Sequence, residues 1–66
     1  MMSQEALIGM RVRVRQDYRL AYLRWKQGTI KNRWGDPDFL ALDVLLDDGV
    51  SELFWHYELE DIAETA

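Results

Sequence analysis

The charges of this chain are divided along its length. Every Lys and Arg lies at or before Arg33. The first 33 residues carry eight basic residues against Glu5 and Asp17, so 8 − 2 gives +6; the last 33 carry ten acidic residues and no Lys or Arg, giving −10 and a net charge of −4. A chain of 66 residues forms one domain. The two halves must therefore share one core, and we expect their charges to neutralise each other across paired strands.

The composition limits the kind of protein further. Three Trp, three Tyr and two Phe supply material for a small core, and the absence of Cys excludes disulfides and thiolate metal sites. No apolar run approaches the ~18 residues that a membrane-spanning helix needs. Residues 1–5 have neither the basic nor the apolar region of a signal peptide. We therefore expect a cytoplasmic protein that does not contact a membrane.

Residues 9–15 carry the clearest strand pattern. Apolar residues recur at every second position, with arginines between them. The pattern predicts a strand with an apolar face of Met10, Val12 and Val14 toward the core. The opposite face carries a stripe of arginines, Arg11, Arg13 and Arg15.

The middle of the chain predicts a loop followed by two strands. Residues 16–26 do not alternate and indicate a long loop with one helical turn. Residues 27–34 alternate again, with an inner face of Gly28, Ile30 and Asn32, and Gly28 indicates a close approach of two backbones. Residues 34–38 contain Gly, Pro and two Asp, which favour a turn, and residues 39–46 form the third strand with Leu40, Leu42, Val44 and Leu46 on one face.

The last part of the chain begins with the strongest hairpin signal, Asp48-Gly49. Residues 50–56 form a fourth strand, whose inner side we assign to Leu53 and Trp55. A single helical turn over residues 56–59 and a short last strand over residues 58–62 follow. We thus expect a flexible segment at residues 1–8, a five-stranded all-β barrel at residues 9–62 and a tail at residues 63–66.

The order of these elements resembles the SH3-like small barrels. The matching pieces are Gly9-x-Arg11-Val12-Arg13-Val14, Gly28-Thr29-Ile30, Leu42-x-Val44-x-Leu46-x-Asp48-Gly49 and Tyr57-Glu58-Leu59-Glu60-x-Ile62. The same pattern is similar to KOW-type and Tudor-type readers, a small accessory protein of photosystem I, the ferredoxin–thioredoxin reductase variable chain and the type II dihydrofolate reductases. These resemblances imply a fold rather than one activity.

One of these families is enzymatic, and it implies a tetramer with a shared pore. Its Val-Gln-Ile-Tyr segment aligns here with residues 51–54, where Glu52 and Phe54 replace the Gln and the Tyr. An oligomeric enzyme of this kind is our second alternative. The chain also lacks the Ala-Leu-Tyr-Asp-Tyr motif and the Trp-Trp pair of SH3 domains that bind Pro-rich peptides.

No constellation of residues points to catalysis or to a cofactor. His56 is the one histidine, and a nucleophile would need a base beside it. We expect His56 to have a structural role. Asp47, Asp48 and Glu52 surround a hairpin, where Asp is ordinary turn chemistry, so we expect neither a metal site nor a cofactor.

The loop before the second strand is our expected contact site, because it is long, aromatic and basic. We expect a non-catalytic module that binds a protein partner or a second copy of itself. The binding residues would be Tyr18, Arg19, Tyr22, Arg24, Trp25 and Trp34. One of Trp25 and Trp34 should be exposed, because a small core has little room for three indoles.

The arginine stripe supports two interpretations. It could contact phosphates of a nucleic acid, with aromatic residues of the loop stacking on bases. The contacts would then be Arg11, Arg13, Arg15, Lys31 and Arg33. Alternatively the first and last strands pair antiparallel, as in SH3-like barrels, and the stripe meets Glu58, Glu60 and Asp61.

Overall fold

The computed structural model describes residues 1–62, so the expected tail lies outside the described residues. Strands and three short 3-10 turns account for the regular structure. In chain order these are η1 (Ser3–Glu5), β1 (Arg11–Val14), η2 (Ala21–Leu23), β2 (Gln27–Trp34), β3 (Ala41–Leu46), β4 (Ser51–Trp55), η3 (His56–Glu58) and β5 (Leu59–Asp61). The expected all-β class is confirmed.

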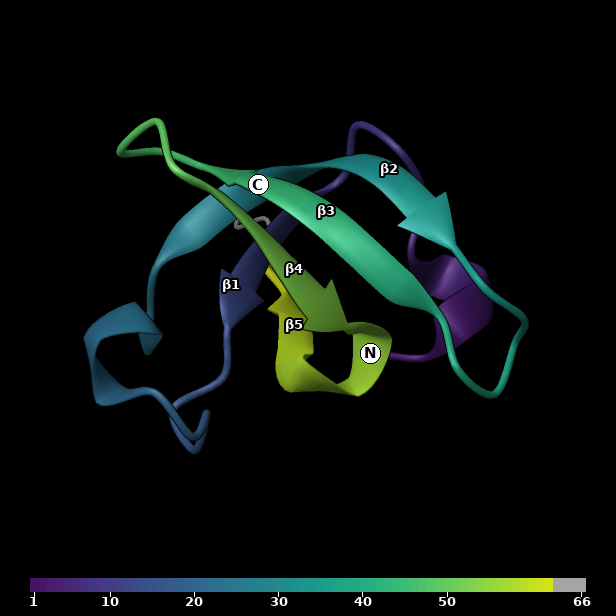
Figure 1. Ribbon diagram of the computed structural model, residues 1–66, viewed down its shortest axis with the longest axis horizontal. Coiled ribbons are helices and arrows are strands. Elements are labelled where there is room, and N and C mark those ends of the chain that lie inside the picture. Colours follow the sequence, from purple (N-terminus) through teal and green to yellow (C-terminus); the bar gives the residue numbers. More distant parts are fainter. Residues whose placement is uncertain (63–66) are drawn as a thin grey trace.

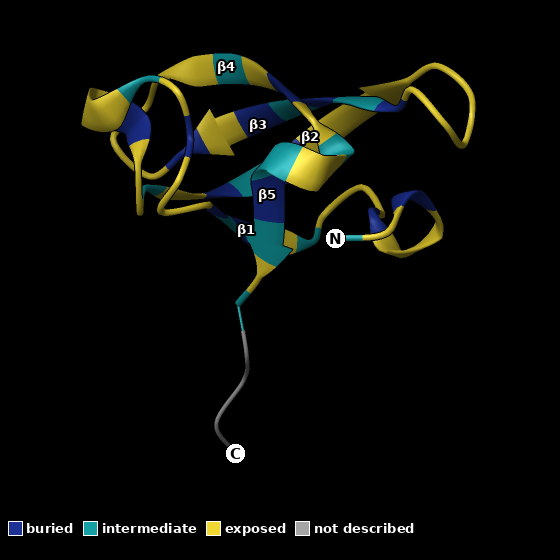
Figure 2. Ribbon diagram, turned by 90° about the horizontal axis from the view of Figure 1, so that it is seen from below, coloured by how far each residue is buried: buried dark blue, intermediate teal, exposed yellow. Residues whose placement is uncertain are grey.

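The five strands form one antiparallel sheet with the order β4-β3-β2-β1-β5 (Figure 1). The sheet bends, so that β1 and β5 lie beneath the layer of β2, β3 and β4 (Figures 1 and 2). Strands β4 and β5 are its two edges and do not pair with each other, so the sheet is open. Pairing of the first strand with the last, as expected from the sequence, is confirmed by the register Arg13 to Glu60.

The core lies between the two parts of the bent sheet, where Figure 2 shows the buried segments of the strands. Its side chains come from all five strands, from the segment before β1, from the loop between β1 and β2, and from Leu40 just before β3. Val12 and Val14 are buried as the alternation in β1 predicts, and Met10 packs partly buried against them. The buried core residues are Ala6, Val12, Val14, Tyr18, Leu23, Ile30, Leu40, Leu42, Val44, Leu46, Phe54 and Leu59.

The inner side of β4 is the reverse of our prediction. Phe54 is buried, whereas Leu53 and Trp55 are exposed. The register pairs Phe54 with Leu42 of β3, and paired residues share one face of a sheet. Because Leu42 faces the core, Phe54 must face it too, and Leu53 and Trp55 lie on the outer face.

Asn32 also lies outside the core, contrary to the prediction for β2. A bulge separates Ile30 from Asn32, so that Lys31 has no partner on β3 and Asn32 pairs with Asp43. An extra residue in one strand moves every later side chain to the opposite face. Ile30 is therefore buried, while Asn32 and Trp34 point to the outer face.

The predicted turns are confirmed. Gly49 has a φ of 92° in the β3–β4 hairpin, a left-handed conformation that glycine adopts without steric cost. In the turn after β2, an oxygen of Asp36 accepts the backbone N–H groups of Asp38 and Phe39, both at 3.0 Å. The 3-10 turns η2 and η3 lie where a helical turn was expected in each case.

The first eight residues, expected as a flexible segment, fold against the sheet. Ala6 is fully buried, and its carbonyl oxygen accepts a hydrogen bond from Arg33 Nη1 at 2.7 Å. The amino group of Met1 donates to the carbonyl oxygen of Leu59 at 3.2 Å. These contacts connect the start of the chain to β2 and β5.

Candidate functional site

A row of aromatic side chains crosses the outer face of β2, β3 and β4. The register pairs Trp34 with Ala41 and Ala41 with Trp55. The three residues therefore stand side by side across the sheet, with the small Ala41 between two indoles. Both indoles are exposed, although a soluble domain ordinarily buries such rings.

Two more rings extend this row beside Trp55. Phe39, from the turn before β3, meets Trp55 edge-on with ring centroids 6.3 Å apart. Tyr57, from η3, lies parallel to Trp55 with centroids 6.5 Å apart. Leu53, the next outward residue of β4, completes a surface that we call the outer aromatic surface: Trp34, Phe39, Ala41, Leu53, Trp55 and Tyr57. Its five large side chains are each 41–66% exposed.

A pocket of about 360 Å³ opens beside this surface, between β4 and the loop that follows β1. Tyr18 and Phe54 lie edge to face there, with centroids 5.3 Å apart, and the guanidinium of Arg19 lies over the Tyr18 ring at 5.6 Å. The pocket is lined by Tyr18, Arg19, Ala41, Leu53, Phe54, Trp55 and Glu58. An apolar surface with an adjoining pocket and few charges resembles the centre of a protein interface.

The surroundings of Tyr18 favour its neutral form. Burial raises the pKa of Tyr18, and the nearby carboxylates of Glu58 and Glu52 raise it further, while Arg19 lowers it. The phenol is therefore protonated throughout the physiological pH range.

The residues that we predicted for partner binding do not form one site. Tyr18 is buried in the core, and only Tyr18, Arg19 and Trp34 lie in the pocket or on the outer aromatic surface. Tyr22 is exposed on η2, and Arg24 Nε donates to the carbonyl oxygen of Tyr18 at 2.5 Å.

Trp25 has a separate environment from the outer aromatic surface. The guanidinium of Arg13 lies over its ring at 5.4 Å. Its backbone has a φ of 70°, which is unusual for a residue other than glycine, and its N–H donates to the carbonyl oxygen of Val14. Both Trp25 and Trp34 are exposed, whereas the sequence predicted exposure of one of the two.

Each arginine of the stripe has a carboxylate partner. Arg13 meets Glu60 across the β1–β5 pair at 3.4 Å, as cross-strand neutralisation predicts. Arg11 binds Asp47 at 2.6 and 2.7 Å through both terminal nitrogens. The third pair, Arg15 with Asp17 at 3.2 Å, lies within one loop. The two other candidates for nucleic-acid contact, Lys31 and Arg33, are exposed, and Arg33 bonds the Ala6 carbonyl.

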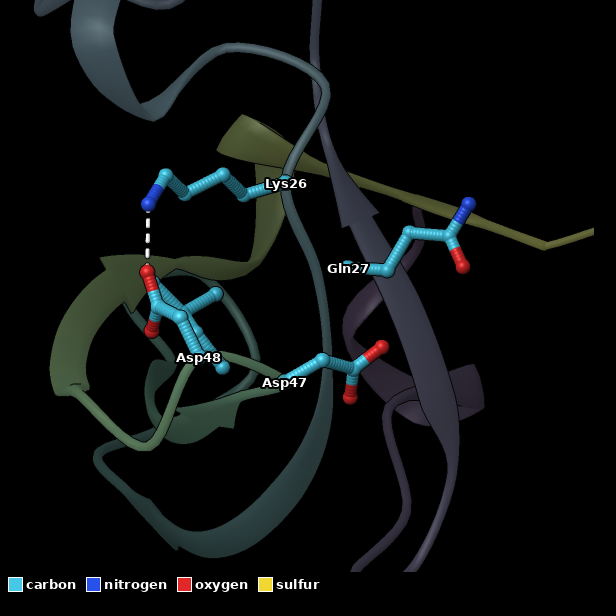
Figure 3. Close-up of a pocket in the computed structure, with 5 residues that line it drawn as sticks. Lys26, Gln27, Asp47 and Asp48 are labelled. Atoms are coloured by element: carbon cyan, nitrogen blue, oxygen red, sulfur yellow. Dashed lines mark hydrogen bonds and ion pairs between the residues drawn. The ribbon is translucent and has the colours of Figure 1, made fainter.

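Acidic residues of the β3–β4 hairpin form ion pairs with basic residues of β1 and of the segment just before β2. Asp48 forms an ion pair with Lys26 beside a small pocket that Gln27 and Asp47 also line (Figure 3). Hydrogen bonds from Lys26 and from the Val50 backbone lower the pKa of Asp48, and the bond from Arg11 lowers the pKa of Asp47. The charged residues that line this pocket are thus engaged in ion pairs between the strands and the hairpin.

These pairs predict a loss of stability in acid. A folded-state pKa below the usual value of 3.8 means that Asp47 stabilises the fold above that pH, and that the contribution disappears as the pH falls through the lower folded value. Asp47→Asn is expected to be less stable than wild type at pH 7 and to lose less on going to pH 2.5, as measured by urea denaturation. A steeper acid loss in the variant would contradict this. In ~1 M salt, where screening is strong, the two proteins should converge.

Residues 1–62 contain no group of three or more His, Asp and Glu placed to hold a metal ion. His56 Nδ1 lies 3.0 Å from the carbonyl oxygen of Met1. Because a carbonyl oxygen only accepts, this ring nitrogen must donate the proton of the hydrogen bond, which connects η3 to the start of the chain.

No helix within residues 1–62 is long and apolar enough to cross a membrane.

Sequence reasoning missed four of the five large residues of the outer aromatic surface. Leu53 and Trp55 were assigned to the core, and Phe39 and Tyr57 were counted within a strand and a turn. The available signal was in β4, where Leu53, Phe54 and Trp55 are consecutive apolar residues. When a strand has apolar residues on both faces and only one face packs against a core, the apolar residues of the other face are exposed.

No family model, curated protein or solved structure matches this chain.

Proposed function

We propose that this chain is a non-catalytic interaction module that docks on a protein partner through the outer aromatic surface. The observation that carries the proposal is the row Trp34–Ala41–Trp55, with Phe39 and Tyr57 beside Trp55. Aromatic residues are enriched at the centres of protein interfaces, because each buries a large area at a small entropic cost. An exposed cluster of this size on a small domain costs solubility unless a partner uses it.

We further propose that the bent sheet is an SH3-like barrel, in which the outer aromatic surface lies on the three-stranded part. Antiparallel pairing of β1 with β5 and the 3-10 turn before β5 support this assignment. The proposal differs from the sequence prediction in its location. The contact moves from the loop around Trp25 to the face of β2, β3 and β4, because that face and its margins gather five large exposed side chains.

Binding of nucleic acid by the arginine stripe is less well supported than protein docking. Phosphate contacts would have to replace the ion pairs with Asp47, Glu60 and Asp17. Each exposed pair contributes only ~0.2–1 kcal/mol, so such replacement is energetically accessible. The experiment that tests docking therefore includes nuclease treatment.

Two matched tryptophan variants test the docking proposal. Tagged protein is used to capture partners from the native lysate with and without nuclease treatment, with Trp55→Ala and Trp25→Ala in parallel. Truncation of an interface hot spot costs ~2 kcal/mol or more, about thirtyfold in affinity. We expect Trp55→Ala to lose a partner that wild type and Trp25→Ala both retain. Retention by Trp55→Ala with loss by Trp25→Ala would place the contact on the loop, and capture abolished by nuclease would favour the arginine stripe.

A further inference from the structure

Strand β4 is an edge strand with backbone groups directed away from the sheet. The hydrogen bonds from Leu46 N–H to the Val50 carbonyl and from His56 N–H to the Leu40 carbonyl fix which residues of β4 face β3. Hydrogen-bonded pairs alternate along an antiparallel ladder. Val50, Glu52, Phe54 and His56 therefore bond to β3, and the intervening residues direct N–H and C=O outward: Ser51, Leu53 and Trp55.

The chain satisfies one of these outward groups itself. The N–H of Trp55 donates to a carboxylate oxygen of Glu58 at 2.8 Å. This outward N–H, where η3 begins, is therefore already hydrogen-bonded. Within residues 1–62 the N–H groups of Ser51 and Leu53 have no comparable acceptor. A native edge is ordinarily blunted by Pro, by Lys, by an inward-pointing charge or by a covering segment, and among the described residues β4 has only the inward-pointing charge of Glu52.

The surroundings of the open edge are acidic. Asp43 lies on the outer face opposite Leu53, and neither Asp43 nor Glu52 forms an ion pair within residues 1–62. Glu58 lines the pocket beside the edge, and Glu52 is close enough to influence Tyr18. The pocket itself is lined by one guanidinium, that of Arg19, and one carboxylate, that of Glu58, so the excess of acid around the edge comes from Asp43 and Glu52.

We propose that β4 accepts an extended segment of a partner protein as a sixth strand, and that this segment alternates apolar with Lys or Arg residues. The inference rests on the proposed docking function. Side chains of an added strand alternate between the two faces. On the outer face an apolar residue would pack against Leu53 and Trp55, and on the other face a basic residue would lie beside Glu52.

A second copy of this chain fits the edge less well. If two β4 strands paired about a two-fold axis at Leu53, Glu52 would stand opposite Phe54 of the other copy. The two Glu52 side chains would then be diagonal neighbours at roughly 7–8 Å, and like charges in that position are unfavourable. The net charge of −4 adds repulsion between copies. Charge complementarity therefore selects a basic segment.

Selection from a displayed library of random twelve-residue peptides tests this inference. We expect the enriched peptides to alternate apolar with Lys or Arg residues, and their affinity to fall as salt is raised. Ser51→Pro removes an outward N–H donor at the first residue of β4, a position where strands tolerate proline. This variant and Glu52→Lys are each expected to weaken binding at least tenfold. Asp61→Lys, which changes an exposed acid on the other edge, is the control and should bind like wild type.

The outcomes separate this inference from the docking proposal. Urea denaturation first establishes that Ser51→Pro is folded, and Glu52→Lys gives an independent test if it is not. Strand addition would be overturned by any of three results: no enriched peptide, enrichment of acidic peptides, or full binding by Ser51→Pro and Glu52→Lys. Loss of partner capture in Trp55→Ala would still support docking in each of these cases. A dimer in sedimentation at micromolar concentration would overturn the basic segment as the occupant of the β4 edge and indicate a second copy of the chain there. If Trp55→Ala captures as well as wild type, the docking proposal itself fails.

Discussion

Replacing Phe54 by alanine is expected to destabilise the domain by about 3–5 kcal/mol, the range for truncation of a buried phenylalanine. Phe54 is 2% exposed and meets the buried Tyr18 ring edge-on. A domain of this size buries only ~60% of its unfolded surface and has a small stability reserve. We therefore expect Phe54→Ala to be largely unfolded at 25 °C, as measured by urea denaturation and near-ultraviolet circular dichroism.

The neighbouring residue supplies the control. Leu53 is 61% exposed on the outer face, so Leu53→Ala is expected to change the free energy of unfolding by less than about 0.5 kcal/mol. The pair of variants tests the register between β3 and β4 directly, because a one-residue slip would exchange the two side chains. A larger loss from Leu53→Ala than from Phe54→Ala would contradict the register described above.

Replacing Gly28 by alanine is expected to have the second largest effect. A Cβ atom at this position would lie 2.5 Å from the carbonyl oxygen of Leu45, 2.7 Å from Val44 Cγ1 and 2.9 Å from Leu46 Cα. Two of these atoms belong to the backbone of β3, so β2 and β3 would have to separate. Overpacking of this kind costs ~1–3 kcal/mol or more. We expect a corresponding fall in the urea midpoint.

Gln27 provides a matched position for this test, because it is the preceding residue of β2 and is exposed. Gln27→Ala is expected to leave stability within about 0.5 kcal/mol of wild type. If Gly28→Ala were as stable as Gln27→Ala, the close approach of β2 to β3 would be wrong.

Local patterns predicted most of the fold. The alternation of Val12 and Val14 with arginines identified β1, and Asp48-Gly49 identified the hairpin, because both signals depend on neighbouring residues alone. Gly28 was expected at a close backbone approach, and the structure places it against β3. The division of charge was also informative, since Arg13 meets Glu60 across the first and last strands.

The errors arose where pairing between strands decides the outcome. The bulge at Lys31 exchanges the faces of β2, and nothing in the local sequence marks it. In β4 both faces are apolar, so the choice between Phe54 and its neighbours depended on the register with β3. The same errors hid the candidate site, because Trp34, Ala41 and Trp55 meet only once three strands are in register.

The most direct test of docking through the outer aromatic surface is an amide correlation spectrum of isotope-labelled protein, recorded free and saturated with the captured partner. The largest changes are expected at the amides of Ser51–Trp55 and at the indole N–H of Trp34 and Trp55, because these groups lie on the exposed edge and face of β2–β4. Changes confined to Ala21–Leu23 and the Trp25 indole, or to Arg11–Val14, would contradict the proposal and place the contact on the loop or on the arginine stripe.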